Sequence, residues 1–464
     1  MEGLGNIRKI FFIGIGGIGM SALAVILKAR GYKVSGSDRA ESSVTQNLIK
    51  QGIDVKIGQK AENISDDIDA VVYTNAISND NPELAKARKM GIPVFERAAM
   101  LNILARDKFA IGVSGTHGKT TTTSMVAKIF LNAGLDPTLA VGGYLAEING
   151  SGHEGKGDFF VYEACEAYGS FLKLHPNIAV ITNIDADHLD YYGNIESIIK
   201  AFEKYIKENI PPDGFIIYNK DDANLRDVIK RVKPTNAISI GINSRADFTA
   251  SKIQLDEFSS SFVVKNKGIE VGNFYVNIPG LHNVYNALLA IATALINRIS
   301  TEIVLATLAN FKNADRRFQL KYFAPDLMVI DDYAHHPAEI DATLSAAKNL
   351  SLKKNAQLIA VFQPHLYSRT RYLYKEFARS LSLADRIVLT EIYAAREKNT
   401  DNVSSKMIYD EIVKIKGREN VIMTEKLSDI PDKVKALLNG RSISIVITLG
   451  AGDVWKVSDM FGHC

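Results

Sequence analysis

The segment GVSGTHGKTTTT, residues 112–123, has the residue types and the spacing to bind the phosphates of a nucleotide. Glycines let backbone N–H groups surround an anion at a helix start, Lys119 adds a positive charge, and the Thr120 hydroxyl can ligate magnesium. The strict Walker pattern fails only at Val113, where it requires glycine. We therefore predict a phosphate-binding loop between a strand and a helix, rather than a Gly/Thr-rich structural turn. The predicted nucleotide contacts are Gly115, Thr116, His117, Gly118, Lys119, Thr120 and Thr121.

Acidic residues and a histidine follow two further strand-like runs. EACE begins at Glu163, and DADHLD contains His188. If both strands run parallel to the strand before the phosphate loop, all three strand ends lie at one edge of the sheet. Carboxylate, imidazole and hydroxyl groups beside a triphosphate suit magnesium, so we predict Thr120, Glu163 and His188 as its ligands. For His188 the alternative is a helix-capping or core histidine.

The neighbouring residues of these two motifs receive more ordinary interpretations. Asp185, Asp187 and Asp190 include expected caps of the helix that follows. Cys165 is expected to pack as a small apolar side chain, because nothing nearby in the sequence indicates a nucleophilic thiol.

A second glycine motif, Gly14 to Gly19, reads GIGGIG and lies between a strand-like run and a helix predicted over residues 20–30. Asp38 ends the next strand, about twenty positions further on. This GxGxxG pattern brings the backbone close to a pyrophosphate at a helix N-terminus, with the acid on a ribose hydroxyl. NAD and a UDP-sugar both contain a pyrophosphate, and a ligand-free turn would fit as well, so all three interpretations stay open.

Polar residues in the second half of the chain also point to ligands. Asn283 and Asn286 are three positions apart on a predicted helix, so both amides can face a flat polar edge such as adenine. Two adjacent histidines, His335 and His336, follow another strand. Zinc is disfavoured because no cysteine cluster or HExxH motif accompanies them, and His336 is explained as the N-cap before Pro337.

Composition restricts the setting in which these residues work. The chain of 464 residues has length for about three domains. Its 55 basic and 52 acidic residues nearly balance at +3, so we expect no nucleic acid and no membrane partner. No apolar run approaches the ~20 residues of a membrane span. The sequence lacks a signal-peptide pattern, and its 2 cysteines predict no disulfide framework, so we expect a cytoplasmic protein.

Strand-like and helix-like runs alternate almost throughout, which predicts a parallel α/β architecture. The alternation breaks near residues 106–107 and again near 313–318. We therefore predict domains over residues 1–106, 107–313 and 314–464. Within the second domain, residues 247–279 form short alternating segments that indicate antiparallel strands.

A resemblance to a known family extends over these motifs. The phrases GIGGIGMSALA, SGTHGKTTTTSM, EACE, TNIDADHLDYYG, GLHNVYNALLAIA, RRFQ, DDYAHHPAEI and FQPHLYSRTR occur in this order along the chain. Together they resemble the Mur ligase family. The resemblance implies an α/β protein of three domains: a Rossmann-like N-terminal domain for a UDP-substrate, a P-loop ATPase-like central domain with a mostly parallel sheet, and a Rossmann-like C-terminal domain that closes over ATP and binds the amino acid.

The same resemblance implies an ATP-dependent acid–amino-acid ligase that uses Mg²⁺ in peptidoglycan synthesis, and so in cell-wall biogenesis, cell shape and cell division. ATP would phosphorylate the lactyl carboxylate of UDP-N-acetylmuramate, and the amine of L-alanine would attack the acyl phosphate, with ADP and phosphate released. The implied partners are these small molecules, for a monomer or a homodimer. Lys119, Glu163 and His188 would be the catalytic residues.

Other residue roles also come from the resemblance. Arg317 and Asp332 would contact ATP, and Asn283 and Asn286 would hold adenine. The amino acid would be bound by Tyr333, His335, His365 and Arg369. The UDP-sugar would be bound by Gly16, Gly17, Ile18, Gly19, Ser37, Asp38 and Arg97. Arg369 is the natural partner of the amino-acid carboxylate, because a guanidinium matches it in charge and fork geometry. The alternative is that Arg369 pairs with a carboxylate of a neighbouring helix.

The chain departs from the wider family at several positions. A magnesium-binding lysine that is carbamylated in many relatives is absent, with Phe202 and Glu203 at its expected place and Lys200 out of register. Its absence favours the alanine-adding branch over the branches that add glutamate or diaminopimelate. Leu366 replaces an arginine that some relatives have beside the amino-acid pocket. Cys165 and Ala167 alter the commoner EADES form to EACEA.

Three alternative functions remain at this point. A murein-peptide recycling ligase would attach a tripeptide to the same nucleotide sugar. An NAD-dependent oxidoreductase would use GIGGIG but would leave the phosphate loop and the acids without a role. A regulatory module without catalysis is disfavoured, because the lysine and both magnesium ligands occur together.

Overall fold

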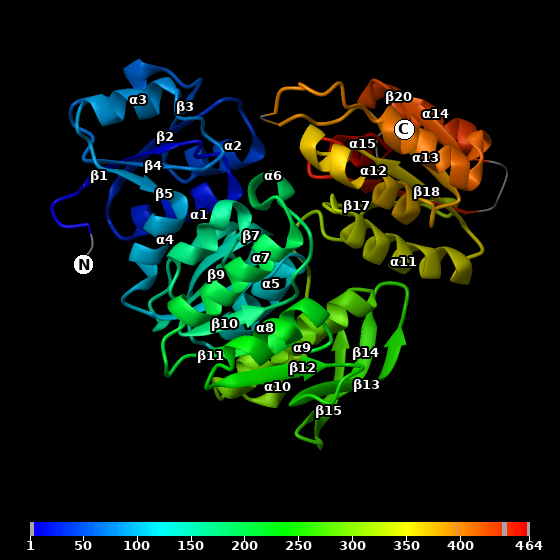
Figure 1. Ribbon diagram of the computed structural model, residues 1–464, viewed down its shortest axis with the longest axis horizontal. Coiled ribbons are helices and arrows are strands. Elements are labelled where there is room, and N and C mark those ends of the chain that lie inside the picture. The colour runs from blue at the N-terminus through cyan, green and yellow to red at the C-terminus, as the bar shows by residue number, and fades with distance from the viewer. Residues whose placement is uncertain (1–3, 396, 439–442, 462–464) are drawn as a thin grey trace.

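The structure is a computed structural model that describes residues 4–395, 397–438 and 443–461. These residues form three sheets, each flanked by helices (Figure 1). The first sheet lies in the blue part of the chain, the second in the cyan-to-green part, and the third in the yellow-to-red part. The predicted α/β class is thereby confirmed, with three sheets in chain order.

The first sheet has five parallel strands in the order β3-β2-β1-β4-β5. Strand order reverses at β1 and β4, where open α/β sheets bind ligands at the carboxyl ends of their strands. The helix predicted from residue 20 begins two residues earlier, with Gly17 as its N-cap. The elements are β1 Lys9–Ile13, α1 Ile18–Ala29, β2 Lys33–Asp38, α2 Ser43–Lys50, β3 Asp54–Ile57, β4 Ala70–Tyr73, α3 Pro82–Lys89, β5 Val94–Glu96 and α4 Arg97–Ala105.

The second sheet has ten strands in the order β15-β14-β13-β12-β11-β10-β6-β9-β7-β8. Its central strands are parallel, and the antiparallel pairing predicted within residues 247–279 is confirmed for β13, β14 and β15. The elements are β6 Phe109–Ser114, α5 Lys119–Asn132, β7 Thr138–Leu145, β8 Gly150–His153, β9 Phe159–Glu163, β10 Ile178–Ile181, α6 Leu189–Tyr192, α7 Ile195–Lys204, β11 Phe215–Asn219, α8 Ala223–Val232, β12 Ala237–Gly241, β13 Phe248–Leu255, β14 Ser260–Asn266, β15 Ile269–Val276, α9 Leu281–Ile296 and α10 Thr301–Ala309.

The third sheet has the order β16-β17-β21-β18-β19-β20, parallel except for the edge strand β16. Helices cover both faces, as parallel sheets require for burial. The elements are β16 Gln319–Phe323, β17 Leu327–Asp332, α11 Pro337–Lys353, β18 Gln357–Phe362, α12 Tyr367–Leu381, β19 Arg386–Thr390, α13 Lys406–Lys416, β20 Val421–Thr424, α14 Ile430–Leu437, β21 Ser444–Leu449 and α15 Trp455–Met460.

The first two sheets share one hydrophobic core. A single cluster of buried side chains runs from Phe12 of β1 and Leu23 of α1 to Phe160 of β9 and Tyr205 just after α7. Helix α1 lies directly on β8, where an added Cβ at Gly152 would overlap the α1 backbone. The third sheet has separate cores on its two faces.

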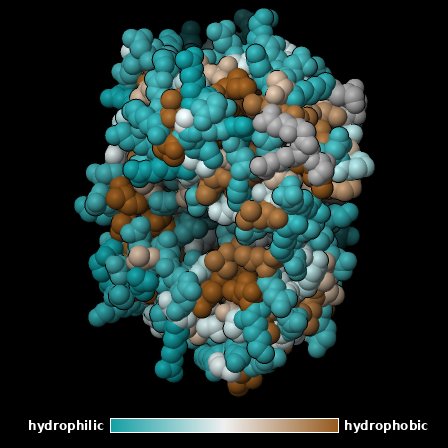
Figure 2. Space-filling model, turned by 90° about the vertical axis from the view of Figure 1, so that its right-hand side faces the viewer, coloured by the Kyte–Doolittle hydropathy of each residue, from teal (hydrophilic) through white to brown (hydrophobic). Residues whose placement is uncertain are grey.

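The outer surface of the molecule is mixed in character. Figure 2 shows a mainly hydrophilic face interrupted by separate hydrophobic patches rather than one continuous apolar band. In the described part of the chain no helix combines the length and the apolar character needed to cross a membrane.

Candidate active site

The three predicted strand ends meet at one edge of the second sheet. β9 and β10 flank β6 on either side, and both pair with it in parallel. The phosphate loop joins β6 to α5, as the sequence predicts. Gly115 and Gly118 have positive φ values of 123° and 82°, and an added Cβ at Gly118 would overlap the Asn286 amide. The loop therefore requires glycine at both positions, as a close backbone cradle for an anion does.

Lys119 lies at the base of this loop, paired with a carboxylate that the sequence analysis missed. Its Nζ donates to the carbonyls of Gly115 at 2.6 Å and Thr116 at 2.8 Å, and to Glu166 Oε1 at 3.0 Å. Burial alone would lower the pKa of Lys119, but Glu166 and nearby acidic groups more than offset it, so the pKa is raised. Lys119 is therefore fully charged, and its charge is already balanced by Glu166.

Glu166 is itself only 2% exposed. Its Oε1 lies 3.7 Å from His188 Nε2, and its backbone carbonyl accepts a hydrogen bond of 2.7 Å from the Tyr192 hydroxyl. Its Oε2 lies 2.9 Å from Lys119 Nζ as an ion pair, but it lacks a partner of hydrogen-bonding geometry among the described residues. The signal in the sequence was the second glutamate of EACE, three positions after Glu163.

The predicted magnesium ligands line one cavity with Lys119. The Thr120 hydroxyl donates to Glu163 Oε2 at 2.7 Å, and an added Cβ at Gly142 would overlap the Glu163 carboxylate. His188 occupies the N-cap position of α6 with a φ of 53°, but its side chain makes no capping hydrogen bond. A hydroxyl, a carboxylate and an imidazole face the same space, and this donor set fits magnesium beside phosphate.

Three residues occupy positions at which the sequence departs from the wider family pattern. Phe202 is fully buried against Phe171, and Glu203 pairs with Arg231 on α8, so neither replaces the absent lysine. Cys165 lines the cavity rather than packing in a core. Burial raises the pKa of its thiol to about 11, which keeps it protonated.

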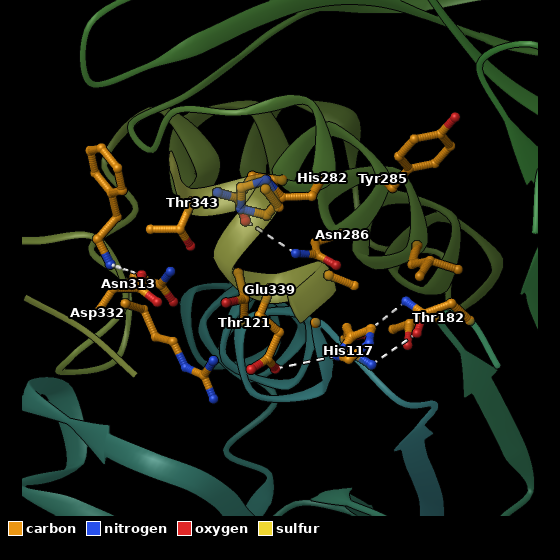
Figure 3. A pocket seen from close by; sticks show the side chains of 18 of the residues that line it. His117, Thr121, Thr182, His282, Tyr285, Asn286, Asn313, Asp332, Glu339 and Thr343 are labelled. Carbon is orange, nitrogen blue, oxygen red and sulfur yellow. Dashed lines mark hydrogen bonds and ion pairs between the residues drawn. The ribbon is translucent and has the colours of Figure 1, made fainter. Parts of the chain in front are cut away.

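A cavity of about 230 Å³ opens beside the phosphate loop (Figure 3). Asn283 and Asn286 both line it, but Asn286 Nδ2 donates to Asn283 Oδ1 at 3.1 Å, and Asn286 Oδ1 accepts from the Thr122 hydroxyl at 3.2 Å. Asn286 therefore supports the loop as well as facing the cavity. His282, which the sequence analysis missed, also lines it, and burial lowers its pKa to about 4.

Arg317 and Asp332 reach this cavity from the third sheet. Asp332 accepts backbone hydrogen bonds from Phe318 at 2.7 Å and Ala334 at 2.8 Å, so it fixes the segment that enters the third domain. Burial, only partly offset by Arg317, raises the pKa of Asp332 to about 6. Arg317 also reaches Thr120, whose hydroxyl lies 3.4 Å from its Nη2.

A larger cavity of about 820 Å³ extends from α1 to the phosphate loop and to the third sheet. Its volume lies within the range of small-molecule sites. Ile18, Lys119, His188, Tyr333 and His335 all contribute to its wall. Of the predicted sugar-nucleotide residues only Ile18 lines this cavity, and of the predicted amino-acid residues Tyr333 and His335 line it whereas His365 and Arg369 do not.

The GIGGIG turn, residues 14–19, lies on the first-domain side of the larger cavity. Asp38 Oδ2 accepts a hydrogen bond of 2.9 Å from the Gly16 backbone, and Arg97 lies close against Gly19. Ser37 is fully buried and its hydroxyl donates to Glu83 at 2.6 Å. Ser37 therefore supports the turn from within and does not present its side chain to a ligand.

Arg369 is engaged by a carboxylate, as the structural alternative for it requires. Its Nη2 and Nε donate to Asp187 Oδ1 at 2.9 and 3.2 Å, and its Nη1 lies 3.2 Å from His365 Nδ1. Asp187 comes from the loop after β10 rather than from a helix. Although burial would raise the pKa of Asp187, Arg369 holds it well below its ordinary range. The role of Arg369 toward an amino acid stays a prediction.

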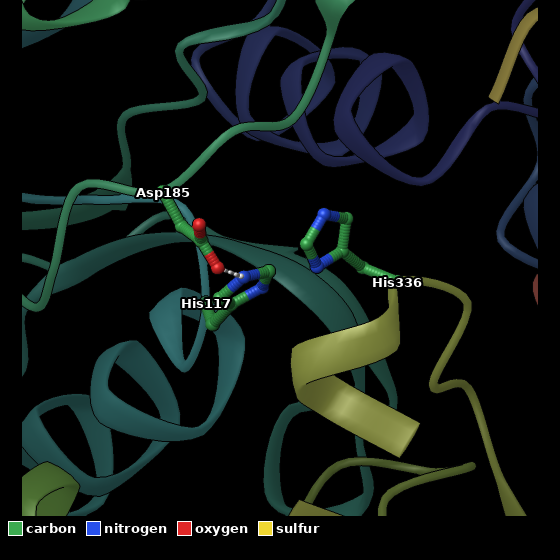
Figure 4. Close-up of side chains that lie close together, drawn as sticks. All are labelled: His117, Asp185 and His336. Atoms are coloured by element: carbon green, nitrogen blue, oxygen red, sulfur yellow. Dashed lines mark hydrogen bonds and ion pairs between the residues drawn. The ribbon is translucent and has the colours of Figure 1, made fainter. Parts of the chain in front are cut away.

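His117 lies between two carboxylates at the tip of the phosphate loop. Its Nε2 is 3.1 Å from Asp185 Oδ2, and its Nδ1 is 3.4 Å from Glu339 Oε1 on α11. The His336 ring lies beside it, tilted by 35°, with 4.7 Å between the ring centroids (Figure 4). His336 is the N-cap of α11, as predicted, and accepts from the Ala338 backbone.

Comparisons with known proteins agree with this architecture. Three family models match in order: "Mur ligase family, catalytic domain" over residues 9–109, "Mur ligase middle domain" over 113–294 and "Mur ligase, glutamate ligase domain" over 316–452. The chain belongs to the Mur ligase family. Mur ligases are ATP-dependent, so the phosphate loop has a role that the oxidoreductase alternative does not provide.

Two similar Mur ligases are called UDP-N-acetylmuramate–L-alanine ligase. The protein from Caldanaerobacter subterraneus is 44% identical, covering 99% of this chain and 98% of its own length. The protein from Clostridium novyi is 46% identical, covering 98% and 97%. The crystal structure of UDP-N-acetylmuramate-alanine ligase from Thermotoga maritima superimposes with a TM-score of 0.82 at 32% identity, covering 98% of each chain.

Proposed function

We propose that this Mur ligase joins L-alanine to the lactyl carboxylate of UDP-N-acetylmuramate, with ATP converted to ADP and phosphate, in peptidoglycan precursor synthesis. The observation that carries the proposal is full-length similarity, at 44% and 46% identity, to two ligases named for this reaction. A single cavity lined by residues of all three domains supports it, because three substrates must meet there. We place the reaction in the cytoplasm, in a monomer or homodimer, with domain boundaries after residues 106 and 313.

The first step transfers the γ-phosphoryl group of ATP to the lactyl carboxylate. Two anions must approach each other, so positive charge at the transferred group lowers the barrier. Lys119 supplies this positive charge when its ammonium group moves from Glu166 to the phosphate. Thr120, Glu163 and His188 would hold magnesium, which when bound would neutralise phosphate charge. Asn283 and Asn286 would orient the base, and Arg317 would reach the phosphates from the third domain.

In the second step the amine of L-alanine attacks the acyl phosphate, and phosphate leaves. Burial is the largest influence on His335 and His365, lowering the pKa of the first to about 4 and of the second to about 3. Both are uncharged at neutral pH and do not repel the ammonium group of the entering amino acid. Tyr333 and His335 would line its path, and Arg369 would hold its carboxylate at the cost of its bond to Asp187.

The sugar nucleotide would lie against the turn of the first sheet. Gly16, Gly17, Ile18 and Gly19 would bring backbone N–H groups to its pyrophosphate, with Asp38 and Arg97 beside them. Calorimetric titration is expected to give binding of UDP-N-acetylmuramate and none of NAD or NADP. Tight NADH binding would move the sugar nucleotide to another part of the cavity.

The proposed reaction is tested by phosphate release from ATP in the presence of UDP-N-acetylmuramate. We expect turnover with L-alanine, less with glycine or L-serine, and none with L-alanyl-γ-D-glutamyl-diaminopimelate. Preference for the tripeptide would instead assign the recycling activity. Absence of turnover with every amine would overturn the proposal.

A further inference from the structure

Glu339 stands where the two cavities meet. It is the third residue of α11, and its side chain lines both the smaller cavity beside Asn286 and the larger cavity beside Lys119. A nucleotide with its base in the first cavity and its phosphates on the loop must pass this carboxylate. The residue belongs to no motif role assigned above.

The two carboxylate oxygens of Glu339 face two different histidines. Oε1 lies 3.4 Å from His117 Nδ1 on the phosphate loop. Oε2 accepts a hydrogen bond of 3.1 Å from the His335 backbone and lies 3.3 Å from His335 Nδ1. Although burial would raise the pKa of Glu339, His335 and His117 hold it well below its ordinary range. One buried anion therefore touches the ATP loop and the amino-acid end together.

Only one of the two ring nitrogens of His117 makes a hydrogen bond. Its Nδ1 is buried and has no partner of hydrogen-bonding geometry among the described residues, while its Nε2 is held by Asp185. A small further approach of α11 would convert the 3.4 Å ion pair with Glu339 into a hydrogen bond. The contact crosses from the second sheet to the third.

The neighbouring His336 does not turn this cluster into a metal site. Ligand atoms of His117, Asp185 and His336 lie within 4.8 Å of one another. However, His336 Nδ1 accepts from the Ala338 backbone, so Nε2 carries the proton and donates to the Ala186 carbonyl at 3.1 Å. Both ring nitrogens are occupied, and the cluster is accounted for by hydrogen bonds and ion pairs.

We propose that Glu339 is a positioning residue that couples the phosphate loop, through His117, to the amino-acid end of the cavity, through His335. Nucleotide on the loop fixes His117, which draws Glu339 and the first turn of α11 into one position. The other carboxylate oxygen then holds the backbone of His335 in place. The amino-acid half of this statement rests on the proposed function, whereas the link to the phosphate loop does not.

An ordinary role for Glu339 is to cap α11, because a glutamate at the third helical position bonds backbone N–H groups at the helix start. Glu339→Gln separates the two roles, since glutamine keeps a capping oxygen and loses the charge that attracts His117. Asp341→Asn is the matched control: the same carboxylate-to-amide change, two residues further along α11, at an exposed position.

The first measurement is the affinity of the full-length protein for β,γ-methylene-ATP with magnesium, without any amino acid. We expect Glu339→Gln and His117→Gln each to weaken binding about tenfold, and the double variant to be no worse than either, because neighbours in one interaction are not additive. Asp341→Asn should match the unaltered protein. Unchanged affinity in Glu339→Gln, or additive losses in the double variant, would overturn the proposal.

The second measurement is the factor by which β,γ-methylene-ATP tightens L-alanine binding when UDP-N-acetylmuramate is saturating. We expect this factor to fall at least fivefold in Glu339→Gln and to persist in Asp341→Asn. An unchanged factor would refute the link to His335. If the unaltered protein does not bind L-alanine at all, the proposed substrate is wrong, and the first measurement still judges the link to the phosphate loop.

Discussion

Lys119 illustrates how a residue can be ready for its substrate and yet be occupied. In this structure its charge is shared between two loop carbonyls and the buried Glu166. In the proposed reaction a phosphate would displace that carboxylate, and the negative charge of Glu166 and Glu163 would then lie beside the nucleotide. We infer that nucleotide affinity depends on a cation that compensates these acids.

Glu166→Gln should therefore make ADP binding less dependent on magnesium, because a neutral amide does not repel phosphate. We expect removal of magnesium with EDTA to cost about tenfold less affinity in this variant than in the unaltered protein, a difference of ~1.4 kcal/mol. Isothermal titration calorimetry measures it. Glu302→Gln, an exposed site on α10, is the control. Equal losses in all three proteins would show that Glu166 does not act on the bound nucleotide.

Arg369 has two partners: it pairs with Asp187 in this structure, and it binds the carboxylate of L-alanine in the proposed reaction. Arg369→Lys should raise the KM for L-alanine far more than that for ATP or the UDP-sugar, because the planar pair of donors is lost. Arg369→Ala should in addition lower the Tm, since a buried Asp187 without its partner costs ~3–5 kcal/mol. Kinetics with each substrate varied in turn and thermal melts measure both. Equal loss for all substrates would leave only the structural role.

At the scale of elements, the phosphate loop depends on the helix behind it. Gly118 begins α5 with a left-handed backbone, and Asn286 of α9 fills the space where its side chain would lie. The loop sequence and α9 are far apart in the chain, yet neither forms the site alone. The loop sequence therefore forms the phosphate site only when α9 places Asn286 beside Gly118.

Gly118→Ala should weaken ADP binding by more than tenfold, because the new Cβ displaces Asn286 and with it the loop. Gly134→Ala is the matched control: its φ is also positive, at 70°, but nothing lies within 4 Å of the added Cβ. We expect the control to cost ~1 kcal/mol of stability from backbone strain alone, with ADP affinity unchanged. Similar ADP affinities in the two variants would contradict the dependence on Asn286.

Much at this scale followed from the sequence. Three parallel strand ends carrying Lys119, Glu163 and His188 were predictable, because strand-like runs that alternate with helices have few possible arrangements. Glu339 was not, since its partner His117 lies more than two hundred residues away and the contact depends on how two domains meet. Asp187 was expected mainly as a helix cap, because its pairing with Arg369 is likewise set by tertiary packing rather than by local sequence.

At the scale of the whole molecule, polar contacts join the third domain to the site. His117 lies between Asp185 and Glu339, with the tilted His336 ring beside it. Burial would lower the pKa of His117, but the two carboxylates more than offset it and raise the pKa to about 9. The imidazolium is therefore the form that holds the domains together at neutral pH.

This predicts a pH dependence of known sign. The contribution of His117 to the contact with α11 is complete below about pH 6.5, its ordinary pKa, and is lost as the pH rises through about 9. Affinity for β,γ-methylene-ATP should fall across that range in the unaltered protein. The same titration of His117→Gln should be flatter. Identical profiles would assign the loss to another group.

The continuous core between the first two sheets bears on how product leaves the site. Helix α1 and β8 fit so closely that an added methyl group at Gly152 would collide with the backbone, so these two domains are packed together as one unit. The third domain, with its separate cores, meets the second through ion pairs, hydrogen bonds and Phe258, which packs against one of those cores. If the third domain moves away to release product, the rate of that motion would set an upper limit on turnover.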